Sequence, residues 1–167
     1  LKLSRGLGDV YKRQVLARAA RLLREHNDEL ARIEVLDVGK VYGEAVSADV
    51  PSGADAMDFF AALAQTDTGD MRRYPDAIAY CERVPLGICA GIGAWNYPVQ
   101  IACWKAAPAL AAGNAFILKP SEMTPLTAHR VAELLSEAGL PEGLFQIGHG
   151  DHKVGRAICA HPGIAKI

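Results

Sequence analysis

The sequence predicts an α/β fold in which a parallel sheet is covered by helices. Two observations carry this prediction. Short, wholly apolar segments such as 115–118 and 144–147 are typical of strands buried on both faces. Between them lie longer segments whose apolar residues recur with the helical period of 3.6, and the alternation of strand and helix is the pattern of a parallel sheet with crossover helices.

The composition excludes several classes of protein. The 167 residues are 50% hydrophobic and 22% charged, which is ordinary for a globular chain and excludes a disordered one. The formal net charge of -1 offers no surface for nucleic acid and no polybasic membrane anchor. The four cysteines lack C-x-x-C spacing, and neither a membrane span nor a signal peptide is recognisable. We therefore expect a cytoplasmic enzyme, or part of one, without nucleic-acid or membrane partners.

The N-terminal half is predicted to be mainly helical. Residues 1–14 have no regular period and resemble read-through of a sequencing adapter, so we expect a non-native or disordered leader. One helix is predicted over 15–36, with Gly39 ending it, and a second from a candidate N-cap at Ser52 to Leu63. A turn-rich segment over 66–75 leads to predicted strands at 77–80 and 84–92.

The second half alternates more regularly. A helix is predicted over 97–112, because Pro98 suits a first turn and Gly113 suits a helix end. A further helix starts at Pro125 after a Thr124 cap and ends at Gly139, and another covers 152–160. Strands are expected at 115–118, 144–147 and 164–167, the last cut short by the chain end. We predict a leader at 1–14, N-terminal helices within 15–82, and the first part of a Rossmann-like domain at 83–167.

Asn96 is the first candidate site residue. It lies in the segment GIGAWNYP at 91–98, where a parallel strand gives way to a helix. Ligands of open α/β sheets gather at the carboxyl ends of strands, and an amide there can donate to a developing oxyanion. Asn is also a favoured helix cap, so both roles stay open. The two G-x-G strings, at 91–93 and 148–150, lack the third glycine of a dinucleotide fingerprint and are weak evidence.

Two further groups have both a functional and a structural interpretation. In the segment KPSE at 119–122, Lys119 and Glu122 can hold a ribose, or they form a solvated charge pair in a turn. Tyr97 and Trp104 are seven residues apart on one helix face, and they can receive a quaternary ammonium by cation–π attraction or pack in the core.

The remaining candidates are weaker. The cluster of His149, Asp151 and His152 lacks the further ligands of a metal site, and Cys89 and Cys103 lie in apolar segments as small hydrophobic residues do.

Together and in this order, these strings resemble the aldehyde dehydrogenase superfamily over about 15–167. The most specific parts are 91–98, 104–114 and 119–125, and the wording GIGAWNYP is similar to the betaine aldehyde and trimethylaminobutyraldehyde dehydrogenases. The resemblance implies a modified Rossmann-like α/β fold, of which this chain would be the N-terminal part. It implies oxidation of an aldehyde to a carboxylate with NAD or NADP, and betaine aldehyde or an aminoaldehyde as substrate.

The resemblance also implies roles for individual residues. Asn96 matches the oxyanion-hole amide and Lys105 a lysine of a proton relay, so both are expected to be catalytic. Tyr97 and Trp104 match aromatics around a trimethylammonium group, while Asp37 and the backbone of Met123 match positions around a structural monovalent cation such as K+. The cofactor would be bound by a longer set: Gly93, Ala94, Trp95, Asn96, Lys119, Pro120, Ser121 and Glu122.

Several implications concern the whole enzyme. The resemblance places the cofactor's glycine turn, the general-base Glu and the nucleophilic Cys beyond this chain, so we expect no activity from these 167 residues alone. The segment 15–82 would include the start of an oligomerisation region, and the full-length parent enzyme would be a homo-oligomer. Glu122 near a ribose 2'-hydroxyl would repel a 2'-phosphate unless the charge of Lys119 offsets it, so the choice between NAD and NADP stays open. The alternatives are a generic aliphatic aldehyde dehydrogenase and a non-catalytic nucleotide-binding module.

Overall fold

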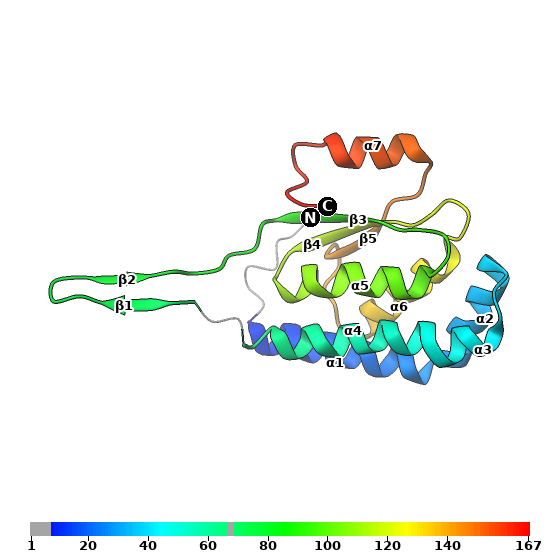
Figure 1. Cartoon of the computed structure of the whole chain (residues 1–167), viewed down its shortest axis with the longest axis horizontal. Coiled ribbons are helices and arrows are strands. Elements are labelled where there is room, and N and C mark those ends of the chain that lie inside the picture. Colours follow the sequence, from blue (N-terminus) through cyan, green and yellow to red (C-terminus); the bar gives the residue numbers. More distant parts are fainter. Residues whose placement is uncertain (1–7, 67–68) are drawn as a thin grey trace.

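A three-stranded parallel sheet lies at the centre of the fold (Figure 1). The computed structural model describes residues 8–66 and 69–167. The strand order is β3-β4-β5, and the segment around Lys166 pairs with β3 on its other side through a single parallel bridge to Cys89. The strands are β3 (Ile88–Ile92), β4 (Ala115–Lys119) and β5 (Phe145–Ile147). The α/β class with a parallel sheet is thus confirmed.

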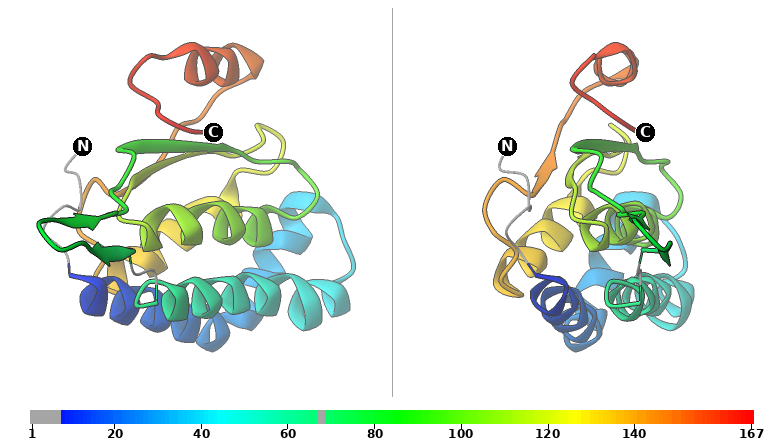
Figure 2. Two further views of the ribbon diagram at one scale, coloured as in Figure 1. Left: turned by 60° about the vertical axis from the view of Figure 1, so that its left-hand side comes forward. Right: turned by 90° about the vertical axis from the view of Figure 1, so that its left-hand side faces the viewer.

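Helices cover the two faces of this sheet unequally. One face carries α5 (Pro98–Ala111) and α6 (Leu126–Glu137), and a second layer of helices lies beneath them. That layer contains α1 (Asp9–Glu25), α2 (Asn27–Val38) and α4 (Val50–Leu63). The opposite face carries α7 (His152–Ala160), as Figures 1 and 2 show. The buried core fills the space between the sheet and the layers of α5, α6, α1 and α4.

The connections reverse direction at one strand. From β3 the chain passes through α5 to β4 and through α6 to β5, moving steadily across the sheet. It then returns over the other face through α7 and pairs on the far side of β3, where Ala90 N–H donates to Lys166 O at 2.9 Å. Such a reversal is a topological switch point, and ligands of open α/β sheets bind beside it at the carboxyl ends of the strands.

The helices of the second half agree closely with the sequence prediction. The expected 97–112 helix is α5, and the expected 152–160 helix has the bounds of α7. Gly113 and Gly139 follow their helices with positive φ, as predicted for helix-ending glycines. The predicted strand at 164–167 is reduced to the bridge at Lys166.

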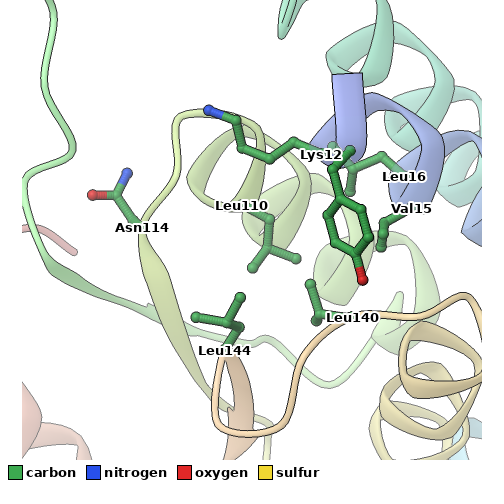
Figure 3. A pocket seen from close by; sticks show the side chains of 8 residues that line it. Lys12, Val15, Leu16, Leu110, Asn114, Leu140 and Leu144 are labelled. Carbon is green, nitrogen blue, oxygen red and sulfur yellow. The ribbon is translucent and has the colours of Figure 1, made fainter. Parts of the chain in front are cut away.

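The predicted leader is wrong for residues 9–14, because α1 begins at Asp9. The Tyr11 hydroxyl donates to the carbonyl of Gly139 at 2.7 Å, which ties this first turn to the end of α6. Lys12 and Leu16 line a small pocket together with side chains from α5 and the β4–β5 connection (Figure 3). Residues 1–7 lie outside the described residues, so the prediction for them stays a prediction.

The single helix predicted over 15–36 is two helices, α1 and α2, which meet at His26. Side chains near the junction bond to other parts of the chain: Asn27 Nδ2 donates to Val46 O at 2.9 Å, and Arg130 Nε of α6 donates to Glu29 Oε1 at 2.6 Å. The second of these contacts links α2 to α6.

The second predicted helix begins earlier than Ser52. A short turn α3 (Tyr42–Glu44) and a π-helical turn η1 (Ala45–Asp49) run directly into α4. Ser52 therefore lies inside α4, where its Oγ accepts a hydrogen bond from Gln100 Nε2 at 2.8 Å instead of capping the helix.

The segment between α4 and β3 forms a hairpin that extends away from the body (Figure 1). Its strands β1 (Met71–Arg73) and β2 (Ile78–Tyr80) pair antiparallel and are exposed throughout. The sequence prediction gave the first of these strands as turn, because three exposed residues have no burial pattern. The strand predicted over 84–92 starts only at Ile88, which is the first residue of β3 to pair with β4, opposite Ala115. No helix within 8–66 and 69–167 is long and apolar enough to cross a membrane.

Gly91 in β3 gives a first testable prediction. A Cβ atom there would lie 2.6 Å from the Cζ of buried Phe116 and 3.0 Å from Lys105 Cδ. We expect Gly91→Ala to lower the free energy of unfolding by about 1–3 kcal/mol, because overpacking forces side chains off their rotamers. The urea midpoint should fall while the m-value stays constant.

The matched control for this substitution is Gly43→Ala. Gly43 lies in α3 with nothing within 4 Å of its ideal Cβ, and Ala is the better helix former by about 1 kcal/mol. This variant should keep or raise the midpoint. A Gly91→Ala chain as stable as the unchanged one would contradict the close packing of β3 on α5.

Candidate active site

An open groove of about 690 Å³ lies beside the switch point. It is bounded by the carboxyl ends of β3 and β4 and by α7. The residues that line it are Ile92, Gly93, Ala94, Trp95, Lys119, Ser121, Glu122, His152, Gly155, Arg156, Cys159 and Ala160. The fold therefore places this open groove where an open α/β sheet is expected to bind a ligand.

Six of the eight predicted cofactor residues line this groove: Gly93, Ala94, Trp95, Lys119, Ser121 and Glu122. Pro120 instead borders a small neighbouring cavity that it shares with Gly93 and Ala94. Asn96 lines neither of the two. The two predicted segments, 93–96 and 119–122, meet here because Gly93 N–H donates to Lys119 O at 2.8 Å, which continues the pairing of β3 with β4.

Lys119 and Glu122 form an ion pair at the wall of the groove. Lys119 is only 3% exposed, and its Nζ donates to the carbonyl of Pro120 at 2.8 Å and lies 3.4 Å from Glu122 Oε2. Hydrogen bonds from its own backbone N–H and from Lys119 lower the pKa of Glu122, so this exposed carboxylate is ionised at neutral pH. The alternative of a solvated charge pair is wrong for Lys119, whose ammonium is buried at the strand end.

The contribution of α7 was missed by sequence reasoning. His152, Arg156 and Cys159 lie on the groove side of this helix, and Arg156 brings a positive charge to the wall that carries Glu122. An ideal Cβ on Gly155 would lie 3.8 Å from Lys119 Cδ, so a small residue allows α7 to approach the strand ends. The available signal was this glycine in the first helix after β5, at the expected edge of the sheet.

Asn96 lies in the turn between β3 and α5, just ahead of the helix. Tyr97 is the N-cap residue of α5, and its side chain makes no hydrogen bond to the first turn of the helix. The N–H of Val99 is satisfied instead by Glu34 Oε1 at 2.9 Å. The capping interpretation of Asn96 is therefore wrong. Among the described residues its side chain has no hydrogen-bond partner, although it is half-buried.

Lys105 lies on α5 next to the same strand. Its Cβ and Cδ are within 3.3 Å of the position that a Cβ on Gly91 would take, so its stem lies against β3 while the residue stays exposed. No ion pair or hydrogen bond ties its ammonium to a residue within 8–66 or 69–167.

Tyr97 and Trp104 are both substantially exposed, at 43% and 54%, so the interpretation as core packing is wrong. The structure does not bring them to one cavity. The ring of Tyr97 faces Lys40, whose Nζ is 4.3 Å from the ring centroid. Trp104 lines a separate open groove of about 390 Å³ between α4 and α5, together with Ser52, Asp55, Ala56, Phe59 and Phe60.

The two residues assigned to a monovalent cation lie near the start of α6. Asp37 Oδ2 accepts a hydrogen bond from the N–H of Leu126 at 2.8 Å, so this carboxylate caps α6 in place of the predicted Thr124. The N–H of Met123 donates to Ser121 Oγ at 3.2 Å. The second carboxylate oxygen of Asp37 and the carbonyl of Met123 are the oxygens of this pair that a cation could use.

The weaker candidates are explained by packing. Burial raises the pKa of both Cys89 and Cys103, the latter to about 12, which keeps these thiols protonated. Asp151 caps α7 by accepting from Lys153 N–H at 2.8 Å, and His149 stacks on His129. No group of three or more metal-ligating side chains occurs in the part of the chain that the structure describes.

A model of the aldehyde dehydrogenase family matches residues 9–167, nearly the whole chain. The chain belongs to this family. The match begins at the first residue of α1, which agrees with the helical structure of residues 9–14.

Solved aldehyde dehydrogenases share the fold closely. KauB from Pseudomonas aeruginosa is 40% identical with a TM-score of 0.90, over 95% of this chain and 32% of that one. Gamma-glutamyl-gamma-aminobutyraldehyde dehydrogenase from Burkholderia cenocepacia J2315 is 41% identical with a TM-score of 0.87, again over 95% and 32%. An indole-3-acetaldehyde dehydrogenase complexed with NAD+ is 37% identical with a TM-score of 0.91, over 95% and 32%. The chain thus spans about a third of the length of these relatives.

Proposed function

We propose that this aldehyde dehydrogenase chain supplies the adenosine-side cofactor wall and the oxyanion amide for NAD(P)-dependent oxidation of an aldehyde to a carboxylate. One observation carries the proposal: the groove at the switch point has the Lys119–Glu122 pair in its wall at the end of β4, and Asn96, whose amide has no hydrogen-bond partner among the described residues, follows the neighbouring end of β3. The NAD+ complex of the 37% identical indole-3-acetaldehyde dehydrogenase supports a nicotinamide cofactor.

The groove suits a dinucleotide by size and by chemistry. Its volume of about 690 Å³ lies within the usual range of ligand sites. Glu122 would accept hydrogen bonds from ribose hydroxyls, and Lys119 would donate to them, while Ala94 and Trp95 would line the nicotinamide side. When bound, the cofactor accepts the hydride that the substrate carbon loses. Arg156 adds a positive charge that offsets Glu122, so the pocket would admit NADP as well as NAD.

The chain's own polar groups would act on the substrate oxygen and on protons. The Nδ2 group of Asn96 would donate a hydrogen bond to the oxyanion that forms when a thiolate adds to the aldehyde carbonyl. Lys105 would take part in moving a proton away from the site. Burial keeps the thiols of Cys89 and Cys103 protonated, which argues against these two as the nucleophile. As the family resemblance implies, we propose that the thiolate and the general base come from residues outside this chain.

A cationic aldehyde, either betaine aldehyde or an aminoaldehyde, is the proposed substrate. The groove at Trp104 supports it, because three aromatic rings surround one open space. Asp55 also lines this groove, where its carboxylate pairs with Arg24 at 2.8 Å. The 41% identical relative is named for an aminobutyraldehyde. A generic aliphatic aldehyde dehydrogenase is the alternative, in which the same rings would form an apolar wall.

Two further features of the parent enzyme are proposed. Exposed Met71, Tyr74, Ile78 and Tyr80 on the β1–β2 hairpin support a homo-oligomer in which a second copy covers them. A monovalent cation such as K+ is proposed at Asp37 and the carbonyl of Met123, supported by the free oxygens described above.

The cofactor proposal can be tested on the 167-residue chain itself. The chain has two tryptophans, so Trp104→Phe leaves Trp95 as the reporter in the groove wall. We expect NAD+ to quench this fluorescence saturably. Lys119→Met should then raise the dissociation constant about five-fold or more, because it removes a charged hydrogen-bond donor.

The matched control is Lys153→Met, which removes the same charge from the exposed side of α7 and should change the dissociation constant less than two-fold. An absence of saturable quenching, or an equal loss in both variants, would refute the groove as the cofactor site.

A further inference from the structure

A buried cluster of three charged residues lies directly behind the turn that carries Asn96. Glu34 from α2 is fully buried, and the side chains of Lys40 and Asp49 are 9% and 4% exposed. Lys40 Nζ lies 3.6 Å from Glu34 Oε2 and forms a close ion pair with Asp49 Oδ2. None of these residues lines the cofactor groove, so the proposed function leaves them without a role.

The cluster holds the start of α5 at two points. Glu34 Oε1 accepts the hydrogen bond of the Val99 N–H at 2.9 Å, and α5 has no side-chain cap of its own. The ammonium of Lys40 lies over the ring of Tyr97. These two contacts are made one and three residues after Asn96, so the backbone that leaves Asn96 is fixed from α2 and from the segment that follows it.

The charges of the cluster are unbalanced, with two carboxylates facing one ammonium. Burial raises the pKa of Glu34 to about 7, the Val99 N–H and Lys40 lower it, and Asp49 raises it further. The other groups that face Glu34 are the buried thiol of Cys103 and, through Lys40, the phenol of Tyr97. An ionised Glu34 caps a helix N-terminus more strongly than a neutral one, because the helix dipole favours negative charge there.

We propose that Glu34 is a positioning residue for Asn96. By capping α5, its carboxylate fixes the turn at 93–97 and so the direction in which the Asn96 amide points. Lys40 and Asp49 hold the carboxylate in place. This inference rests on the proposed role of Asn96 in the oxyanion site. Removal of the cap should release the turn and misplace the amide, and a displacement of about 1 Å can cost two orders of magnitude in rate.

Nuclear magnetic resonance of the 167-residue chain tests the structural half of the inference. The chain has three asparagines, and those at 27 and 114 donate their side-chain amides to the carbonyls of Val46 and Ala109, so they serve as internal references. The Asn96 side-chain amide and the Val99 N–H should both shift with pH, with a midpoint near 7.

Three variants complete this arm. Glu34→Gln keeps an oxygen for Val99 and should hold the Asn96 signal near one position at every pH. Glu34→Ala should move it towards the position of a free amide. Glu25→Gln, on the exposed side of α1, is the matched control and should leave the titration unchanged. An Asn96 signal that is identical in the unchanged chain and in Glu34→Ala would overturn the proposal.

Kinetics of a full-length dehydrogenase that carries this segment test the catalytic half. Glu34→Ala should lower kcat about ten-fold and leave the KM for NAD+ within about two-fold, while Glu34→Gln should restore most of the rate. The double variant Glu34→Ala with Asn96→Ala should be no slower than Asn96→Ala alone, because Glu34 acts through Asn96.

The outcomes separate the two ideas. If Asn96→Ala alone has near-normal kcat, the proposed role of Asn96 fails. If Asn96→Ala is slow and Glu34→Ala slows it by a further ten-fold, the role of Asn96 stands and the positioning role of Glu34 is refuted.

Discussion

Replacement of Asn96 by alanine in the full-length dehydrogenase is expected to lower kcat about 100-fold or more. The loss of one preorganised oxyanion donor has this effect because the donor is worth most when charge develops on the oxygen. The amide follows the carboxyl end of β3, is not used as a helix cap, and has no partner among the described residues. Steady-state kinetics with a saturating aldehyde and NAD+ measure the change, and the KM for NAD+ should move little.

The control for this experiment is Gln100→Ala. Gln100 carries the same kind of amide one turn further along α5, but it donates to Ser52 Oγ at 2.8 Å and packs α5 on α4. Its loss should change kcat by less than about three-fold, since it removes one neutral hydrogen bond between α5 and α4. Near-normal turnover of Asn96→Ala would reduce Asn96 to a residue of the turn alone.

Trp104→Ala in the same enzyme is expected to raise the KM for betaine aldehyde about ten-fold, equivalent to about 1.4 kcal/mol of binding. A quaternary nitrogen keeps its charge at every pH and is attracted to the face of an indole ring. An uncharged aldehyde of similar size should lose much less. The lining of the groove supports a role for Trp104 in substrate binding, because Phe59, Phe60 and Asp55 line the same open space.

Of the two aromatic residues predicted to bind the trimethylammonium group, the structure favours Trp104 over Tyr97. Tyr97 already has the ammonium of Lys40 at 4.3 Å from its centroid, so one of its faces is in use within the chain. Phe59→Leu provides the comparison, since it removes wall area with less effect on cation binding and should weaken both aldehydes alike. If Trp104→Ala also weakens both substrates equally, a generic aldehyde dehydrogenase becomes the better description.

Local signals predicted the second half of the fold well. Pro98 and Gly113 enclose α5, and the helix expected over 152–160 has the bounds of α7, because these signals depend on a few neighbouring residues. The errors at the starts of α1 and α6 have a common cause. The start of α1 is tied to Gly139, and the start of α6 is capped by Asp37. The bonded residues are 128 and 89 positions apart in the sequence, so the local spacing of apolar residues does not reveal these contacts.

The candidate site was also predicted only in the parts that depend on local sequence. The segments 93–96 and 119–122 were predicted because each follows a strand, and strand ends meet at one edge of a parallel sheet. Arg156 was missed because the approach of α7 depends on the return of the chain across the sheet. Glu34 did leave a signal: it lies beside Leu30 and Ala31 on the buried side of α2, where a carboxylate requires a partner.

The return of the chain to the far side of β3 has a consequence for the order of folding. β3 is synthesised well before residues 165–166, whose backbone groups bond Ile88 and Ala90. Until then this edge of β3 is unpaired, and an unpaired strand edge invites association with other chains. The helices of the N-terminal layer can assemble earlier, because their contacts join residues nearer in sequence and the loops between them lose less entropy on closing. The cofactor groove, which needs α7 in place, is therefore completed at the same late step that protects the sheet from aggregation.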